Sequence, residues 1–577
     1  MIDPHGAKST NGCTSGAVSL IGRRHAARRM GLAAVMLLAL ASVAAASVQE
    51  EPAQPELRAV WVDAFHHGIR SPSEAAQLVA DAKRIHLNTL IVQVRRRGDA
   101  LYTGGLEPPL DDPAYDPSFD ALAHIVSIAH EAGLQVHAWI NAMPVWRDEA
   151  PPKDARHVFN RHGPGAASGQ SWLTSTRSGT RKFPVGYFLD PGHPAARDHL
   201  VAVYLDIVRR YDIDGIHFDY IRYPETEGAP LPRGADVGYN PVSVARFQRE
   251  ARRKAVPLPD DEAWTRWRRE QVTGLIRRIA IEAQAIKPRL KVSAAVIAWG
   301  APPATNDDFE NTAPMQRVFQ DWRCWLEEGI IDLAVPMNYA REHDERGRDW
   351  YDGWITWEKR HKADRQLAVG VGGYLSAPEG VLAQIGRARR LESGARADGV
   401  SLFSYYLPFA APVAPPEAPA AAPTAQAPTE AAPVPAVQAV PAGSTPPPSA
   451  PPPPPPAPER LDYLVQGAGS TPAVFAGPVP VPAMPWIERP AEGWIAGTVV
   501  NKPGKAVDRR TIRMWSARGP GKVLKTSSDA NGWFGMARLA PGTYRVQLEN
   551  EKGKTVGSRI DVVVSAGAVA RVTLAGK

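Results

Sequence analysis

The sequence predicts an α/β protein in which a (β/α)8 TIM barrel is followed by a proline-rich linker and a small all-β sandwich. Three observations support this architecture. Between residues 55 and 409, eight short β-branched runs alternate with amphipathic helical stretches. Residues 410–460 are almost entirely Ala, Pro, Thr, Val, Glu and Gln, a composition typical of an extended linker. Residues 491–577 carry short alternating strands separated by Gly, Asn and Pro turns.

The first 46 residues predict a secretory signal peptide. Four arginines between positions 23 and 29 precede the apolar run Met30–Leu40, and Ala44–Ala46 offer a cleavage site. A retained N-terminal anchor is the alternative, and either general secretion or a twin-arginine route fits the arginines. Cleavage after Ala46 removes five basic residues and one acidic residue, which lowers the net charge from +7 to +3. We therefore expect a periplasmic or extracellular protein without a stable membrane span and without a nucleic-acid partner.

Cysteine and histidine usage argues against a metal or a cofactor. Cys13 lies in the signal region, so Cys324 alone remains in the mature chain and can form no internal disulfide. The adjacent histidines at 66 and 67 do not have the spacing of metal ligands, and no glycine-rich phosphate loop is present. We expect no metal and no cofactor.

The elements of the barrel follow in order along the chain. We expect strands at 57–64, 88–95, 135–142, 215–222, 291–298, 331–339, 366–374 and 399–406, and helices near 73–86, 120–132, 195–211, 261–287, 311–328, 349–363 and 378–393. Helix-to-strand connections are a few residues long, whereas the strand-to-helix segments 143–194 and 223–260 are long. Because active sites of such barrels lie at the carboxyl ends of the strands, these loops predict a binding site there.

The segment after the linker has two parts. Residues 461–490 form a connecting segment that we expect to pack on the barrel, and residues 491–577 form the sandwich. Ser528–Phe534 and Leu539–Tyr544 resemble the hairpin and turn of the prealbumin-like, carboxypeptidase-regulatory fold. The partner of this domain cannot be predicted from its sequence.

The fourth predicted strand carries the clearest candidate for chemistry. In Asp212–Pro224, alternation places His217 and Asp219 on one face, with the carboxylate at the strand end. A carboxylate there needs a partner. The alternative to a catalytic role is a pair between Asp219 and Arg222, or between Asp219 and His217, that only fixes the loop.

The other strand ends carry amide, charged and aromatic side chains. Sugars present hydroxyl edges and apolar C–H faces, so this combination favours a carbohydrate site over a simple aromatic core. The predicted substrate-binding residues are Arg95, Tyr102, Trp139, Asn141, His217, Tyr220, Arg222, Trp299, Asn338 and Tyr339.

Seven motifs, in order over residues 55–409, resemble the bacterial glycosyl-hydrolase-like family that was formerly known only as a domain of unknown function. They are Leu57-Arg-Ala-Val-Trp-Val, Gln93-Val-Arg with Gly98-Asp-Ala-Leu-Tyr, His137-Ala-Trp-Ile-Asn, Leu189-Asp-Pro-Gly, Asp214-Gly-Ile-His-Phe-Asp-Tyr-Ile-Arg-Tyr-Pro, Gln320-Asp-Trp and Asp332-Leu-Ala-Val-Pro-Met-Asn-Tyr. The resemblance implies a (β/α)8 barrel, export, and hydrolysis of a cell-envelope glycan, with peptidoglycan strands as the substrate class.

Individual positions also match the motifs of that family. Asp219 matches its fourth-strand acid, Trp139 and Asn141 match its third-strand motif, and Arg95, Asp99 and Tyr102 match its second-strand loop. Two stretches depart from the expected pattern: Arg96-Arg97, where a less basic stretch with a proline is expected, and Ala142-Met-Pro, where a Pro-Tyr-like sequence is common. These departures point to different subsites.

Glycoside hydrolysis requires a second group besides Asp219. Asp99, Asp190 or Glu342, each on a predicted active-face loop, could complete an acid pair, or the N-acetyl group of the substrate could attack with Asp219 orienting it. The missing partner also leaves open a different class of function, a non-catalytic glycan-binding or envelope scaffold protein.

Overall fold

The computed structural model describes residues 54–576, apart from residues 168, 227–233, 393, 408–460, 503, 520–521 and 551–552. The predicted signal peptide at 1–46 and the whole of the predicted linker at 410–460 therefore lie outside the described residues. Within the described part, no helix combines the length and the apolar character needed to cross a membrane.

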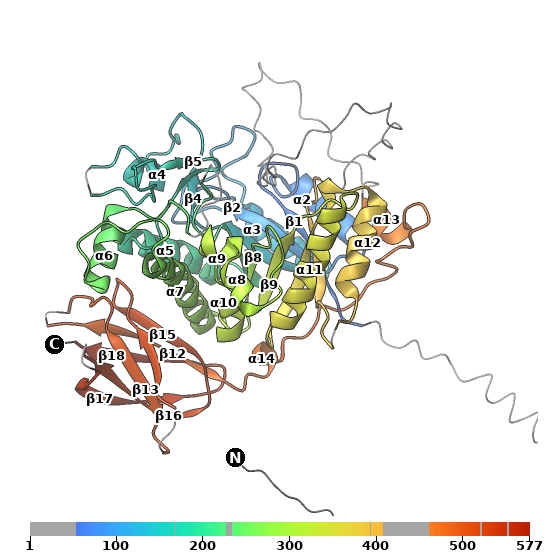
Figure 1. Ribbon diagram of the computed structural model, residues 1–577. Helices are drawn as coiled ribbons and strands as arrows, with labels where there is room; N and C mark the ends of the chain where they lie inside the picture. The colour runs from blue at the N-terminus through green and yellow to red at the C-terminus, as the bar shows by residue number, and fades with distance from the viewer. Residues whose placement is uncertain are drawn as a thin grey trace, which may run out of the picture. The chain divides into compact units, whose positions relative to one another are not determined.

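Eight parallel strands close into a barrel, which confirms the predicted fold class (Figure 1). Around the barrel their order is β1, β11, β10, β9, β8, β7, β3 and β2. Their bounds are β1 Leu57–Val62, β2 Thr89–Arg95, β3 Gln135–Asn141, β7 Gly215–Asp219, β8 Lys291–Val296, β9 Leu333–Asn338, β10 Gln366–Gly372 and β11 Gly399–Phe403. Most of the strands end earlier than predicted, because the chain turns into the loops of the carboxyl-end face.

Helices surround the barrel, and most lie where the sequence places them. They are α2 Pro72–Arg84, α3 Ala121–Glu131, α5 Pro194–Arg210, α6 Pro241–Ala251, α7 Glu262–Ile286, α8 Asn306–Glu310, α9 Ala313–Gln316, α10 Trp322–Glu328, α11 Glu345–His361 and α12 Pro378–Arg389. The predicted helix at 311–328 is wrong as a single element. It breaks into α9 and α10 because Phe319 adopts a φ of 56° and the Gln320 side chain accepts a hydrogen bond from the Ile297 N–H at 2.8 Å.

The long loop after β3 has its own structure. It contains a small antiparallel sheet in the order β4, β6, β5 and a short helix, where the sequence predicted only loop. These elements are β4 Pro144–Trp146, α4 Val158–His162, β5 Lys182–Phe183 and β6 Gly186–Phe188. The loop is thus a fixed part of the carboxyl-end face.

The segment 461–490 covers the amino-terminal end of the barrel. It contains α13, Tyr463–Gln466, and α14, Pro485–Glu488. Met484 belongs to the cluster of side chains that fills the barrel interior, and the Trp486 indole donates to Asp332 Oδ1 at 2.7 Å. Asn88 and Gln366, at the starts of β2 and β10, donate to backbone carbonyls of the same segment. The amino-terminal end of the barrel is therefore closed by this segment.

The C-terminal strands form two sheets, β15-β12-β18 and β14-β13-β16-β17, which enclose a core of their own. The strands are β12 Gly493–Val500, β13 Thr511–Ser516, β14 Leu524–Ser527, β15 Trp533–Leu539, β16 Gly542–Glu549, β17 Thr555–Val564 and β18 Val569–Ala575. This confirms the predicted β-sandwich.

The sandwich contacts the barrel along α7 (Figure 1). Trp533 packs with Ile281 of α7 and donates its indole N–H to Glu282 at 2.8 Å. Arg246 of α6 is buried and forms two bonds with Asp508 of the sandwich, at 2.8 and 3.0 Å. Apolar packing and buried ion pairs thus attach the two domains.

We expect Asp508→Ala to destabilise the full chain by about 2 kcal/mol or more, because it leaves the buried guanidinium of Arg246 without its carboxylate. The measurement is urea unfolding followed by tryptophan fluorescence.

The matched control is Asp364→Ala, which breaks an exposed ion pair with Arg538 between the same domains. Exposed pairs contribute about 0–1 kcal/mol, so this variant should unfold close to the wild-type protein. Equal destabilisation by the two variants would show that the buried pair of Arg246 and Asp508 contributes no more to stability than an exposed ion pair.

Candidate active site

A hydrogen-bonded chain crosses the barrel interior below the carboxyl-end face. The Trp61 indole N–H donates to His217 Nε2 at 3.0 Å, and His217 Nδ1 lies 2.9 Å from Ser293 Oγ. Because an indole N–H can only donate, Nε2 must accept, and the proton of the ring is on Nδ1. Burial lowers the pKa of His217 to about 3. His217 is therefore a neutral histidine that orders the interior.

Asp219 lies at the end of β7, one layer above His217. Its Oδ1 accepts from the backbone N–H of Tyr220 at 2.6 Å and from Arg222 at 3.2 Å. Tyr220 itself has a φ of 49°, a conformation uncommon outside glycine. Burial raises the pKa of Asp219, and Arg222 and the Tyr220 N–H oppose that shift.

Asn141 is the neighbour of Asp219 across the β3–β7 pair. Its Oδ1 accepts from the Trp139 indole at 3.1 Å, and its Nδ2 donates to the backbone carbonyl of Arg96 at 3.1 Å. Asn141 thus joins the carboxylate-bearing strand to the loop after β2.

Aromatic side chains gather around the barrel axis at this level. Trp61 makes edge contacts with Tyr339 and Phe403, at centroid distances of 6.4 and 6.1 Å, and Trp139 lies 6.4 Å from Phe403. Arg222 lies over the rings of Tyr220 at 4.1 Å and Trp299 at 5.5 Å. The structure therefore brings most of the predicted binding residues together around Asp219.

Two of the predicted binding residues lie elsewhere, against the helix layer. Arg95 is fully buried and forms a double ion pair with Glu107, at 2.6 and 2.8 Å. A register shift in β2 after Gln93 turns its side chain toward α5, where it lies 5.8 Å from the Tyr204 ring. Tyr102 is also buried and contacts the Tyr211 ring. Neither side chain has surface to offer a substrate.

Asn338 also faces outward, toward α11. Its Nδ2 donates to Glu358 Oε2 at 2.8 Å, and Asn338 Oδ1 and Glu358 Oε1 are both buried without a partner. Burial raises the pKa of Glu358 to about 8. The raised pKa favours the protonated form of Glu358, so the hydrogen bond from Asn338 joins two neutral side chains at the end of β9.

The three carboxyls considered as partners of Asp219 are engaged elsewhere. Asp99 is fully buried and paired with Arg96 at 3.0 Å, and Asp190 is fully buried and accepts from Ser243 at 2.8 Å. Burial raises the pKa of Asp190 to about 6. Glu342 is in an ion pair with Arg387. The structure does not bring these three to Asp219.

Two other carboxyls lie on the carboxyl-end face. Glu225 follows Pro224 in the loop after β7; burial raises its pKa, and the charge of Arg222 opposes the shift. Asp63, two residues after Trp61, accepts from His66 at 2.8 Å, and the His66 ring is stacked on Tyr406 at 4.1 Å. Glu225 lies in an irregular loop without periodicity, so the sequence pattern does not single it out.

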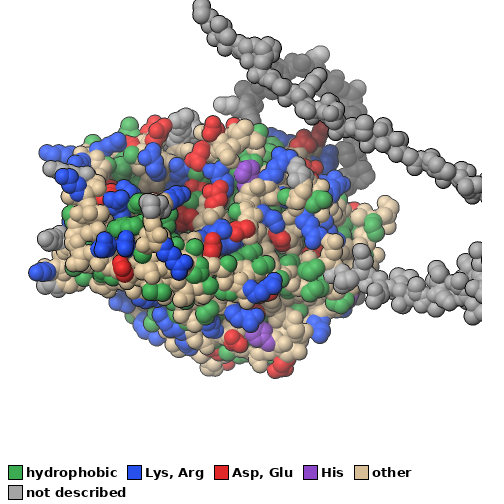
Figure 2. Space-filling view, turned by 90° about the horizontal axis from the view of Figure 1, so that it is seen from below, with side chains coloured by type: hydrophobic (Ala, Val, Ile, Leu, Met, Phe, Trp, Pro, Cys, Tyr) green, Lys and Arg blue, Asp and Glu red, His purple; other side chains and the backbone are tan. Residues whose placement is uncertain are grey.

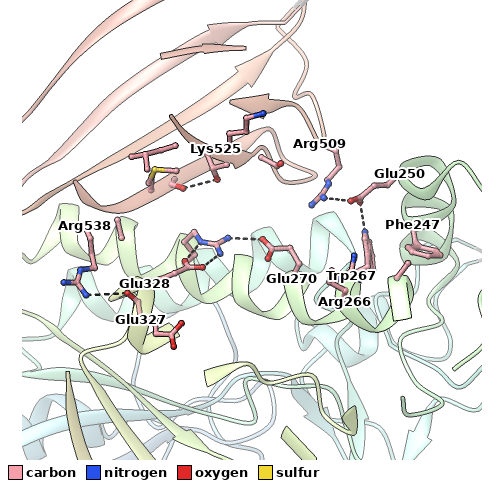
Figure 3. A pocket seen from close by; sticks show the side chains of 18 of the residues that line it. Phe247, Glu250, Arg266, Trp267, Glu270, Glu327, Glu328, Arg509, Lys525 and Arg538 are labelled. Carbon is pink, nitrogen blue, oxygen red and sulfur yellow. Dashed lines mark hydrogen bonds and ion pairs between the residues drawn. The ribbon is translucent and has the colours of Figure 1, made fainter. Parts of the chain in front are cut away.

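A cavity of about 930 Å³ lies away from this site, between α7 and strands β14 and β15 (Figure 3). Its charged lining is largely paired internally. Arg277 bonds Glu270 at 3.0 Å and Glu328 at 2.8 Å, and Glu250 accepts from Trp267 at 2.8 Å. Among the described residues, no group of three or more His, Cys, Asp and Glu side chains could hold a metal ion.

On the face of the molecule that Figure 2 shows, acidic side chains lie among the basic ones, so neither sign of charge covers this face alone.

The site therefore combines a buried carboxyl with clustered aromatic side chains at the carboxyl end of a closed parallel barrel, where the active sites of such barrels lie. The chain belongs to the glycosyl hydrolase-like 10 family, whose model matches residues 56–372. This confirms the resemblance seen in the sequence motifs.

Two curated relatives carry the name glycosyl hydrolase. The chain is 25% identical over 367 residues to glycosyl hydrolase YngK of Bacillus subtilis, covering 58% of this chain and 66% of that protein. It is 25% identical over 330 residues to glycosyl hydrolase DigH of Escherichia coli K12, covering 51% and 66%. The chain thus spans slightly less than two thirds of either relative. The glycoside hydrolase domain of PgaB from Bordetella bronchiseptica matches at 16% identity and a TM-score of 0.43, over 60% of this chain and 94% of that domain.

The neutral pair at the end of β9 predicts a pH-dependent stability. The folded-state pKa of Glu358, about 8, lies above its ordinary value of 4.5, so the folded protein holds this proton more tightly than the unfolded chain. The resulting stability is complete below about pH 4.5 and is lost as the pH rises through 8. Glu358→Gln should therefore be more stable than wild type at pH 9, as measured by urea unfolding at pH 6 and 9.

Glu345→Gln, on the exposed first turn of the same helix, is the control and should leave the pH dependence unchanged. A Glu358→Gln variant that keeps the wild-type pH dependence would show that Glu358 is ionised in the fold.

Proposed function

We propose that the protein is an exported glycoside hydrolase that cleaves a bacterial cell-envelope glycan, with peptidoglycan strands as the substrate, and that Asp219 and Glu225 are its catalytic carboxyls. The observation that carries the proposal is the position of Asp219, at the end of β7 beside Arg222 and the aromatic residues around the barrel axis. Family membership supports the reaction class, and the first 46 residues support export.

The environments of the two carboxyls suggest different roles. Both pKa values are raised by burial, but Asp219 receives hydrogen bonds from a backbone N–H and from Arg222, which favour its ionised form. The burial-driven rise in the pKa of Glu225 is opposed by the charges of Arg222 and Arg317, with no hydrogen bond to its carboxylate among the causes. We therefore assign Glu225 as the acid that protonates the leaving oxygen and Asp219 as the carboxylate that acts on the opposite side of the bond.

The surrounding residues suit a sugar substrate. Tyr339 and Trp299 are partly exposed and can stack on C–H faces of the rings. The Trp61–His217 bond holds this layer in place from below.

Asp219→Asn should lower hydrolysis of purified sacculi by about a thousandfold or more, since the amide cannot act as a base or nucleophile. The measurement is release of reducing ends or soluble fragments, with circular dichroism to show that the variant is folded. Wild-type turnover in Asp219→Asn would overturn the assignment. Binding of sacculi by the wild-type protein without any release would favour a glycan-binding protein instead.

Glu225→Gln should lower kcat/KM by about 10²–10⁴-fold and remove the alkaline limb of the pH profile. The reason is that Glu225 must be protonated to act, so the rate falls as the pH rises through its raised pKa. Glu342→Gln is the control, because its carboxylate is already paired with Arg387. An alkaline limb that survives in Glu225→Gln would place the acid elsewhere.

A further inference from the structure

An exposed aromatic ring and an arginine whose guanidinium has no direct ion pair among the described residues lie side by side on the carboxyl-end face. Phe65, in the loop after β1, is 43% exposed, although phenylalanine is among the residues most often buried. The guanidinium carbon of Arg97, in the loop after β2, lies 5.0 Å from the centre of its ring. Nothing in the fold or in the proposed chemistry so far requires this exposed pair.

The two arginines beside Phe65 differ in their partners. Arg96, 5.4 Å from the ring, forms an ion pair with Asp99 at 3.0 Å. The guanidinium of Arg97 takes part in no hydrogen bond or ion pair within the described part of the chain; only its backbone N–H does, donating to Asp99. Burial, and then the charge of Arg96, lowers the pKa of Arg97 to about 10, so it remains cationic at neutral pH. The charges of Asp148 and Asp99 act on Arg97 without bonding its guanidinium, so a carboxylate placed against it would form the direct ion pair that the described residues do not supply.

This pair is connected to the proposed catalytic carboxyl. The Phe65 N–H donates to Asp63 Oδ1 at 2.9 Å, and the backbone carbonyl of Arg96 accepts from Asn141, the neighbour of Asp219. The charge of Arg97 also acts on the Tyr220 hydroxyl, whose pKa it lowers against the larger effect of burial. Phe65 and Arg97 therefore lie on the same face as Asp219, on the side formed by the loops after β1 and β2.

We propose that Phe65 and Arg97 form a subsite for an acidic sugar, in which the C–H face of the ring stacks on Phe65 and a ring-borne carboxylate pairs with Arg97. The inference rests on the proposed function, because it concerns the substrate of the same face. It also accounts for Arg97 in the sequence, where the resemblance to the family led us to expect a less basic stretch.

The test compares soluble cell-wall glycan strands that bear free carboxylates with the same strands after conversion of the carboxylates to methylamides. Arg97→Gln should raise KM for the free acid by about tenfold, leave kcat unchanged, and change KM for the amide little. Arg97→Lys should keep part of the preference, and added salt should weaken it in the wild type. Phe65→Ala should raise KM for both forms, since stacking requires no charge.

The matched control is Arg156→Gln, which makes the same change of charge in the loop after β3. Arg156 is exposed and already paired with Asp154, so KM for both forms should stay at the wild-type value. A change in Arg97→Gln that is equal for the acid and the amide, or absent, would overturn the subsite.

Calorimetric binding of the two glycans separates this inference from the proposed hydrolysis. If the wild type cleaves neither form but binds the acid more tightly, and Arg97→Gln loses that preference, the subsite stands and the hydrolase proposal fails. If the wild type cleaves both forms and binds them equally, the hydrolase proposal stands and the subsite is overturned.

Discussion

The hydrogen bond from the Trp61 indole to His217 is the interaction on which the carboxyl-end face depends. The two residues belong to strands that are not neighbours, so the bond spans the barrel interior. It requires a neutral histidine with its proton on Nδ1, and burial favours that form. Because side chains alternate along a strand, the residues two positions further on, Asp63 and Asp219, lie one layer above. The neutral layer of Trp61 and His217 thus lies directly beneath the layer that contains Asp63 and Asp219.

Hydrogen bonds and ion pairs connect the sandwich to a loop of the carboxyl-end face. Arg197 donates to the carbonyl of Pro191, and Arg246 donates to that of Gly192, in the loop that joins β6 to α5. Their charges are neutralised by Asp529 and Asp508, both supplied by the sandwich. Two buried arginines therefore bond a loop of the carboxyl-end face on one side and the C-terminal domain on the other. The sandwich stabilises the barrel whether or not it binds a partner of its own.

The sequence predicts the architecture well because the barrel repeats one local pattern eight times. Each strand and helix can be recognised from the hydrophobic pattern of its own residues. The alternation of β7 correctly placed His217 and Asp219 toward the axis. The same reasoning failed at β2, where a register shift after Gln93 turns Arg95 outward. It also grouped Asn338 with Tyr339, although neighbours in a strand face opposite sides. Bulges and strand ends depend on tertiary contacts that periodicity does not contain.

Periodicity also does not identify Glu225, the proposed partner of Asp219, for the same reason. Glu225 follows a strand that ends three residues earlier than predicted, past a tyrosine with a positive φ and a proline. The observation that associates it with Asp219 is that the charge of Arg222 acts on both carboxyls. Asp99, Asp190 and Glu342 looked equivalent in sequence, but each is held by a partner that gives it a structural role. Distinguishing an acid that is available from one that is committed requires its hydrogen-bond partners, and these come from distant parts of the chain.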